Sequence, residues 1–77
     1  MNRQRLRGEI IAKYGNQDNF ADAIGWSKQK VSYILTGKRK LNTDDVAKVA
    51  QVLGLSESMF VNIFLPQALP NGNEAAV

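Results

Sequence analysis

The fold of this chain is decided by residues 17–38, which read QDNFADAIGWSKQKVSYILTGK. Phe20, Ala21 and Ile24 share one face of a short predicted helix over residues 17–24, and Asn16 can cap its first turn. Gly25 ends that helix, because glycine readily adopts the positive φ that a tight turn requires.

A second short helix is predicted over residues 28–36, directly after this turn. Ser27 can cap it, Val31 and Ile34 face inward, and Gly37 ends it. Two helices joined by so tight a turn cross steeply, as in a helix-turn-helix. The sequence therefore predicts that the outer face of the second helix is exposed.

Three more helices are predicted around this pair, because apolar residues recur at helical spacing in each. They cover about residues 3–14, the stretch from Asn42 or Thr43 to Gly54, and about residues 57–65. The expected fold is all-α, with one compact five-helix domain over residues 1–66. A flexible C-terminal tail is expected over residues 67–77, where no periodic pattern continues.

The composition argues against catalysis, since the 77 residues include no cysteine and no histidine. Thiol chemistry and the commonest metal ligands are therefore missing. Asp44 and Asp45 do not suit a catalytic pair, because adjacent positions on a helix point about 100° apart. We expect no enzyme activity, metal site, cofactor or small-molecule ligand. No apolar run approaches the roughly 20 residues of a membrane span, and no secretory signal is present, so a cytoplasmic location is expected.

Positive charge is concentrated in the middle of a chain whose net charge is only +3. Residues 23–43 include no acidic residue and five basic ones: Lys28, Lys30, Lys38, Arg39 and Lys40. Such a block is typical of a face that meets the phosphates of a nucleic acid. A solvated lysine-rich loop is the alternative explanation.

The outer face of the helix over residues 28–36 carries side chains that suit DNA bases. Glutamine pairs with adenine, lysine donates to guanine, and serine or tyrosine contacts bases or phosphates. The residues on this face are Lys28, Gln29, Ser32, Tyr33 and Thr36. Lys28 and Lys30 also stand in the first turn, where the helix dipole disfavours cations. A bound phosphate would offset this unfavourable interaction with the helix dipole. The alternative explanation is that both lysines are tolerated at the surface at a small cost in stability.

These residues resemble the helix-turn-helix of the XRE-like phage repressor and Cro family. Residues 17–38 match it in register, and residues 46–56, VAKVAQVLGLS, resemble its fourth helix, so the resemblance covers about residues 5–65. It implies a lambda-repressor-like DNA-binding domain. The implied function is a sequence-specific regulator, a Cro-like repressor or lysogeny-switch modulator, that binds double-stranded operator DNA as a homodimer.

The resemblance implies roles for Gln17, Lys28, Gln29, Tyr33 and Lys38 to Lys40, and the outer face and first turn of the helix over residues 28–36 add Lys30, Ser32 and Thr36. The expected base-reading residues are Lys28, Gln29, Ser32 and Tyr33. The expected contacts to the DNA backbone are Gln17, Lys30, Thr36, Lys38, Arg39 and Lys40. The family often has Glu-Asn before the glycine where this chain has Leu35-Thr36, so Leu35 is expected either to fill the core or to meet a partner.

The predicted helix over residues 56–65 has more apolar residues than one buried face needs. Its expected core residues are Phe60, Ile63 and Phe64. The residues predicted for a protein-partner patch are Met59, Val61 and Leu65. The alternative explanation is that a small domain leaves these apolar residues exposed without a partner. The alternative function is therefore a protein-binding modulator, antirepressor or antitoxin-like, that acts on a second regulatory protein through this helix.

Overall fold

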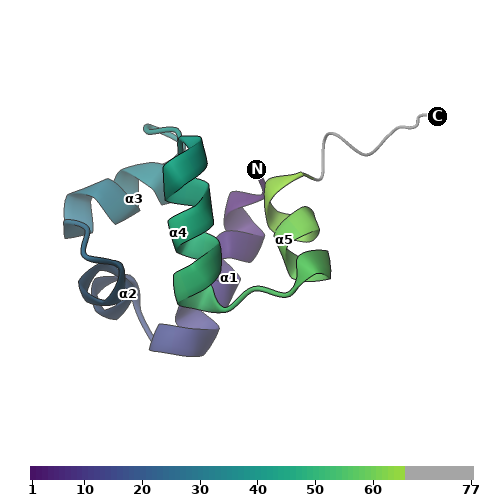
Figure 1. The fold of residues 1–77 in the computed structure, drawn as a ribbon. Helices are drawn as coiled ribbons and strands as arrows, with labels where there is room; N and C mark the ends of the chain where they lie inside the picture. Colours follow the sequence, from purple (N-terminus) through teal and green to yellow (C-terminus); the bar gives the residue numbers. More distant parts are fainter. Residues whose placement is uncertain (66–77) are drawn as a thin grey trace.

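The computed structural model describes residues 1–65 and contains five α-helices in that range (Figure 1). They are α1 (Arg3–Tyr14), α2 (Gln17–Ile24), α3 (Lys28–Thr36), α4 (Thr43–Leu53) and α5 (Glu57–Phe64). No strand occurs in the described part of the chain, which confirms the expected all-α fold. The predicted tail over residues 67–77, and Pro66 before it, lie outside the described residues.

Local side-chain signals set the helix ends where the sequence predicted them. Asn16 and Ser27 each accept a hydrogen bond from the third backbone amide of the helix that follows. Asn42, rather than Thr43, caps α4. Its side chain accepts from the Asp45 amide while the Asp45 carboxylate accepts from the Asn42 amide, so the two residues form a capping box.

All five helices contribute to one hydrophobic core, and α1 packs against each of the other four. The buried side chains are Leu6, Ile10, Phe20, Ala21, Ile24, Val31, Ile34, Leu35, Val49, Leu53 and Ile63. Leu35 is only 5% exposed, which answers the question left by the sequence: it fills the core. Burying a side chain of this size stabilises a fold by roughly 1.5–3 kcal/mol.

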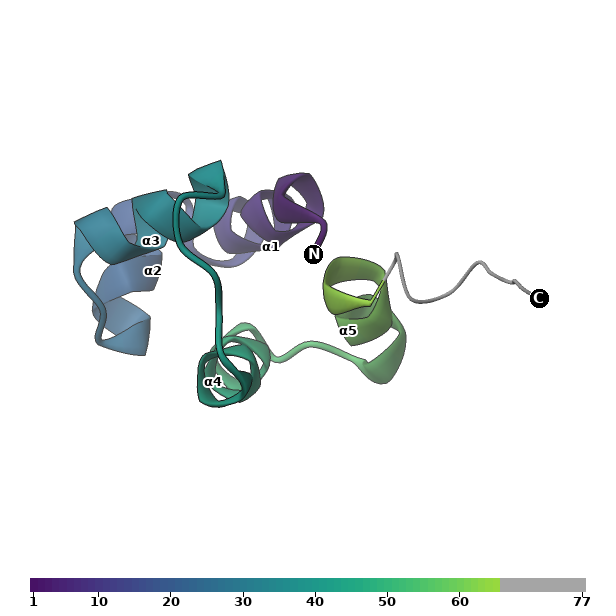
Figure 2. The same cartoon turned by 90° about the horizontal axis from the view of Figure 1, so that it is seen from above.

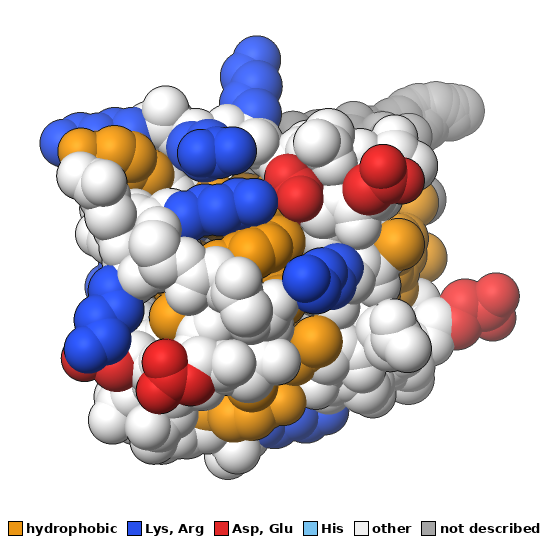
Figure 3. Space-filling model, turned by 60° about the vertical axis from the view of Figure 1, so that its left-hand side comes forward, with side chains coloured by type: hydrophobic (Ala, Val, Ile, Leu, Met, Phe, Trp, Pro, Cys, Tyr) orange, Lys and Arg blue, Asp and Glu red, His pale blue; other side chains and the backbone are white. Residues whose placement is uncertain are grey.

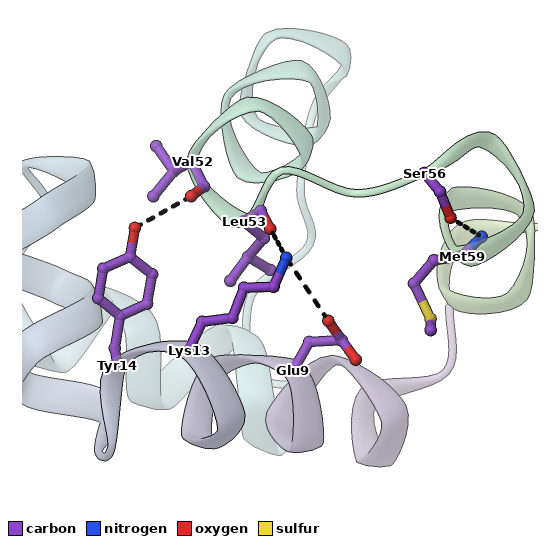
Figure 4. A network of polar contacts seen from close by, with 7 residues as sticks. All are labelled: Glu9, Lys13, Tyr14, Val52, Leu53, Ser56 and Met59. Atoms are coloured by element: carbon purple, nitrogen blue, oxygen red, sulfur yellow. Dashed lines mark hydrogen bonds and ion pairs between the residues drawn. The ribbon is translucent and has the colours of Figure 1, made fainter.

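Polar contacts from α1 hold the carboxyl end of α4 (Figure 4). The Lys13 ammonium group donates to the Leu53 carbonyl, and the Tyr14 hydroxyl donates to the Val52 carbonyl at 3.0 Å. Carbonyls in the last turn of a helix have no partner within the helix, and a cation there also suits the helix dipole. These contacts fix the end of α4 against α1, and α5 begins separately after Ser56, whose side chain accepts from the Met59 amide.

The first residues of the chain are joined to the last turn of α5. The Asn2 amide donates to the Ile63 carbonyl at 2.6 Å, and the Ile63 side chain is fully buried. The two ends of the described fold therefore lie side by side. None of the helices within residues 1–65 has the length and apolar character that a membrane crossing needs.

Candidate nucleic-acid interface

The helices α2 and α3 cross in space and are joined by only three residues (Figures 1 and 2). Gly25 has φ 78° and ψ 26°, and its amide and that of Trp26 both donate to the Ala21 carbonyl, at 2.9 and 3.0 Å. Ala21 is fully buried, as a close approach of helices requires, and Val31 turns inward from α3. The opposite side of α3 faces solvent.

The outward side of α3 holds the residues that were predicted to read bases. Lys28, Gln29 and Tyr33 are exposed, and Ser32 beside them is half-buried. The Gln29 amide nitrogen donates to the Tyr33 hydroxyl at 3.0 Å, one helical turn away. The exposed Gln29 side chain keeps its carbonyl oxygen and a second N–H beyond this bond, which is the donor and acceptor set that pairs with a base. Thr36, also exposed, donates its hydroxyl to the Ser32 carbonyl at 3.0 Å.

The two lysines in the first turn of α3 have different surroundings. Lys28 lies 3.6 Å from Asp18 of α2, and both side chains are more than 60% exposed. Lys30 lies 4.0 Å above the Trp26 ring and 3.6 Å from Asp45 of α4, and its side chain is only 20% exposed. The structure therefore gives Lys30 contacts inside the fold, and its expected contact with the DNA backbone stays a prediction.

These ion pairs also change the electrostatic argument drawn from the sequence. Although residues 23–43 include no acid, folding brings Asp18 and Asp45 to the amino end of α3. The unfavourable effect of the helix dipole on Lys28 and Lys30 is thus offset within the protein, without a bound phosphate. Figure 3 shows the result: the basic side chains gather along the upper and left parts of this face, and acidic ones adjoin several of them.

Tyr33 connects the outward side of α3 to the basic segment that follows it. The Tyr33 carbonyl accepts from the amides of Lys38 and Arg39, at 2.9 and 3.1 Å. The Lys38 ammonium group lies 5.5 Å from the centre of the Tyr33 ring. Lys38, Arg39 and Lys40 are all exposed. Three exposed cations therefore follow the predicted base-reading residues, and the first of them lies over the Tyr33 ring.

A fourth cation, Arg3, lies at this end of α3 and was not predicted from the sequence. Gly37 has φ 83°, and a Cβ atom added to it would lie 3.0 Å from the Arg3 guanidinium carbon. The guanidinium thus covers Gly37 at the carboxyl end of α3, where the helix dipole favours a cation. No local signal in the sequence marks this contact, because it depends on how α1 packs against α3.

Gln17, the expected phosphate contact on α2, is the first residue of that helix and is half-buried. The cap is supplied by Asn16, whose side chain accepts from the Asn19 amide at 2.8 Å. The Gln17 amide group is consequently not needed to cap the helix. Its position at the positive end of α2 is compatible with a phosphate contact.

The predicted partner patch on α5 is arranged differently from the expectation. Ile63 is fully buried as predicted, but Phe60 and Phe64 are only half-buried and line a surface groove together with Leu65. Met59 packs partly against the core, and Val61 is half-buried and does not line that groove. Of the three residues predicted for the patch, only Leu65 lies at this groove.

No group of three or more Asp, Glu, His or Cys side chains within residues 1–65 is arranged to hold a metal ion. A protein-family model described as "Protein of unknown function (DUF739)" matches residues 2–66. No curated protein matches the chain.

Proposed function

The chain belongs to this family of unknown function, and we propose that it is a sequence-specific DNA-binding regulator that places α3 in the major groove of a short operator. The observation that carries the proposal is the arrangement around Tyr33. Its hydroxyl accepts a hydrogen bond from Gln29, and its carbonyl accepts from the amides of Lys38 and Arg39. Its ring lies under the Lys38 side chain. One residue thus holds a base-reading side chain and a phosphate-binding segment in fixed register.

In this proposal the residues fall into two groups with different effects. Lys28, Gln29, Ser32 and Tyr33 contact base edges and determine which site is bound. Gln17, Thr36, Lys38, Arg39 and Lys40 contact the DNA backbone and supply affinity for any sequence. Lys30 is no longer included, because it is engaged with Trp26 and Asp45.

The protein acts as a Cro-like repressor or lysogeny modulator. Two copies bind half-sites about one helical turn apart, and the bound dimer blocks access to a promoter. Such a protein works in the cytoplasm, where the DNA of a bacterial host lies.

The experiment begins with a selection of bound sites from random double-stranded DNA, because the operator is not known. Affinity for the selected site is then measured against salt for the natural chain, for Gln29→Ala, and for a triple variant with Lys38, Arg39 and Lys40 changed to Ala. Gln29→Ala should lose about 1–3 kcal/mol of discrimination at one base pair. The triple variant should weaken binding to all sequences and reduce the salt slope by about 2–3, at roughly 0.9 per phosphate contact.

The matched control for charge removal is Arg5→Ala. Arg5 is exposed and lies about 200° around α1 from Arg3, at 100° per residue. This control should leave the salt slope unchanged. If the selection enriches no site and the triple variant behaves like the control, the proposal is wrong.

A further inference from the structure

A surface groove of about 430 Å³ lies beside α5, on the side of the molecule toward the α3–α4 loop. Figure 2 looks down on the elements that form it: the amino end of α1, the loop after α3, the start of α4, and α5. Its apolar lining includes Leu41, Val46, Phe60, Phe64 and Leu65. The two phenylalanine rings are 4.9 Å apart, and Leu65 is 44% exposed. The fold leaves this apolar surface only partly covered.

The groove has a positive rim. Arg3, Arg39 and Lys40 line it, and no acidic residue among residues 1–65 does. The ion pairs found within residues 1–65 use Lys13, Lys28 and Lys30, so none of these three rim cations is paired there. The groove therefore offers an apolar floor beside cations that are free to pair with carboxylates.

We propose that this groove binds an acidic amphipathic helix from another protein. Apolar side chains one turn apart would enter between Leu41, Phe60 and Leu65, as in other helix-in-groove complexes. Asp or Glu residues flanking that stripe would meet Arg3, Arg39 and Lys40. Charge complementarity selects such a partner over a basic or neutral one.

A second copy of the chain fits the same groove less well. In a two-fold symmetric pair, the same patch faces itself across the axis. Two such grooves would therefore bring six cations together, and no acidic residue in the described lining offsets them. Like charges placed opposite one another in an interface oppose association.

Binding of the helix also excludes DNA. Arg39 and Lys40 line the groove, and the proposed function assigns the same two residues to the DNA backbone. This competition rests on the proposed function, whereas binding of the acidic helix does not. The partner would thus act as an inhibitor of operator binding.

The probe is a synthetic peptide of about 14 residues, or four helical turns, with leucines along one face and glutamates elsewhere. Its binding to the full chain is followed by fluorescence anisotropy. One control peptide has lysine in place of every glutamate, and another has the same residues in scrambled order. The acidic amphipathic peptide should bind at least about tenfold more tightly than either control, equivalent to ~1.4 kcal/mol.

Two pairs of variants locate the site. Leu65→Asp should weaken peptide binding about tenfold or more, whereas Ile11→Asp should change it less than twofold; both side chains are 44% exposed, and Ile11 lies outside the groove. Arg3→Ala should weaken binding several-fold, and Arg5→Ala should not. Equal behaviour within either pair overturns the proposal. The proposal is also overturned if sedimentation shows that the chain without peptide is a dimer and that Leu65→Asp makes it a monomer. A second copy of the chain would then occupy the groove.

Adding operator DNA separates this proposal from the proposed function. Leu65→Asp should bind DNA normally and escape inhibition by the peptide, whereas Gln29→Ala should lose site preference and still bind the peptide. Peptide binding in a chain that binds no DNA refutes only the proposed function and the competition. If the peptide binds but leaves DNA binding unchanged, the proposed competition is wrong. If the peptide does not bind, the proposed binding of an acidic helix in the groove is wrong.

Discussion

Replacing Lys30 with methionine separates a structural role from a DNA contact. Methionine keeps much of the apolar stem of lysine and removes its charge, so the variant tests the ammonium group alone. That group lies 4.0 Å from the centre of the Trp26 ring and 3.6 Å from Asp45. Its loss should reduce the free energy of unfolding while leaving DNA binding by the folded protein unchanged.

The size of the effect follows from the geometry. A cation over an indole ring contributes about 0.5–1 kcal/mol when exposed and about 2 when desolvated, and the Lys30 side chain is only 20% exposed. The ion pair with Asp45 adds about 0.5–1 kcal/mol. Removing a cation from the first turn of a helix returns a few tenths. The net loss is therefore about 1–2 kcal/mol, measured by urea unfolding.

Lys28→Met is the matched control, since Lys28 stands in the same turn of α3. Its pair with Asp18 is more than 60% exposed on both sides and contributes little, so stability should change by less than about 0.5 kcal/mol. A Lys30→Met variant that unfolds like the natural chain and reduces the salt slope of DNA binding by about 1 would contradict a structural role for Lys30. In that case Lys30 would be the phosphate contact that the sequence indicated.

Three further predictions concern backbone and hydroxyl groups. Gly8→Ala should raise the free energy of unfolding by about 0.5–1 kcal/mol in thermal or urea unfolding, because Gly8 is within α1 and has open space around it. Gly37→Ala should lower it by about 1–2 kcal/mol, because Gly37 has a positive φ. Equal effects of the two substitutions would contradict this contrast. Tyr33→Phe removes the hydrogen bond from Gln29, and it should weaken binding to the selected DNA site by about 1 kcal/mol without changing the free energy of unfolding. An unchanged DNA affinity would show that this hydrogen bond does not position Gln29. Tyr14→Phe should lower the unfolding free energy by about 1 kcal/mol, as it removes a bond to the end of α4, and no change would mean that solvent satisfies that carbonyl equally well.

The helix limits were predictable from the sequence because the signals that set them are local. A cap such as Ser27 and a stop such as Gly37 act within a few residues, and the structure places α3 between them. Burial of Leu35 could not be decided in the same way, because a position near the edge of the apolar stripe is covered or not according to the neighbouring helices.

The candidate site was harder to predict, since it depends on contacts between distant segments. Lys30 and Asp45 are fifteen positions apart, and the packing of α4 against α1 and α2 brings them together. The same holds for Arg3 at the end of α3, and for the groove beside Phe60 and Leu65. Periodicity shows that a residue is apolar and on a given face, but not which element covers that face.

The hydrogen bond between Asn2 and Ile63 has a mechanical consequence. Because the two ends of the described fold meet there, a pulling force applied to them loads the α1–α5 junction before any other contact. The helices would then peel apart bond by bond, and not slide past each other with many bonds sharing the load. Since Leu6 and Ile10 of α1 are central to the core, peeling α1 removes the support of every other helix. The described fold would therefore open from the α1–α5 junction when it is pulled between Asn2 and Ile63.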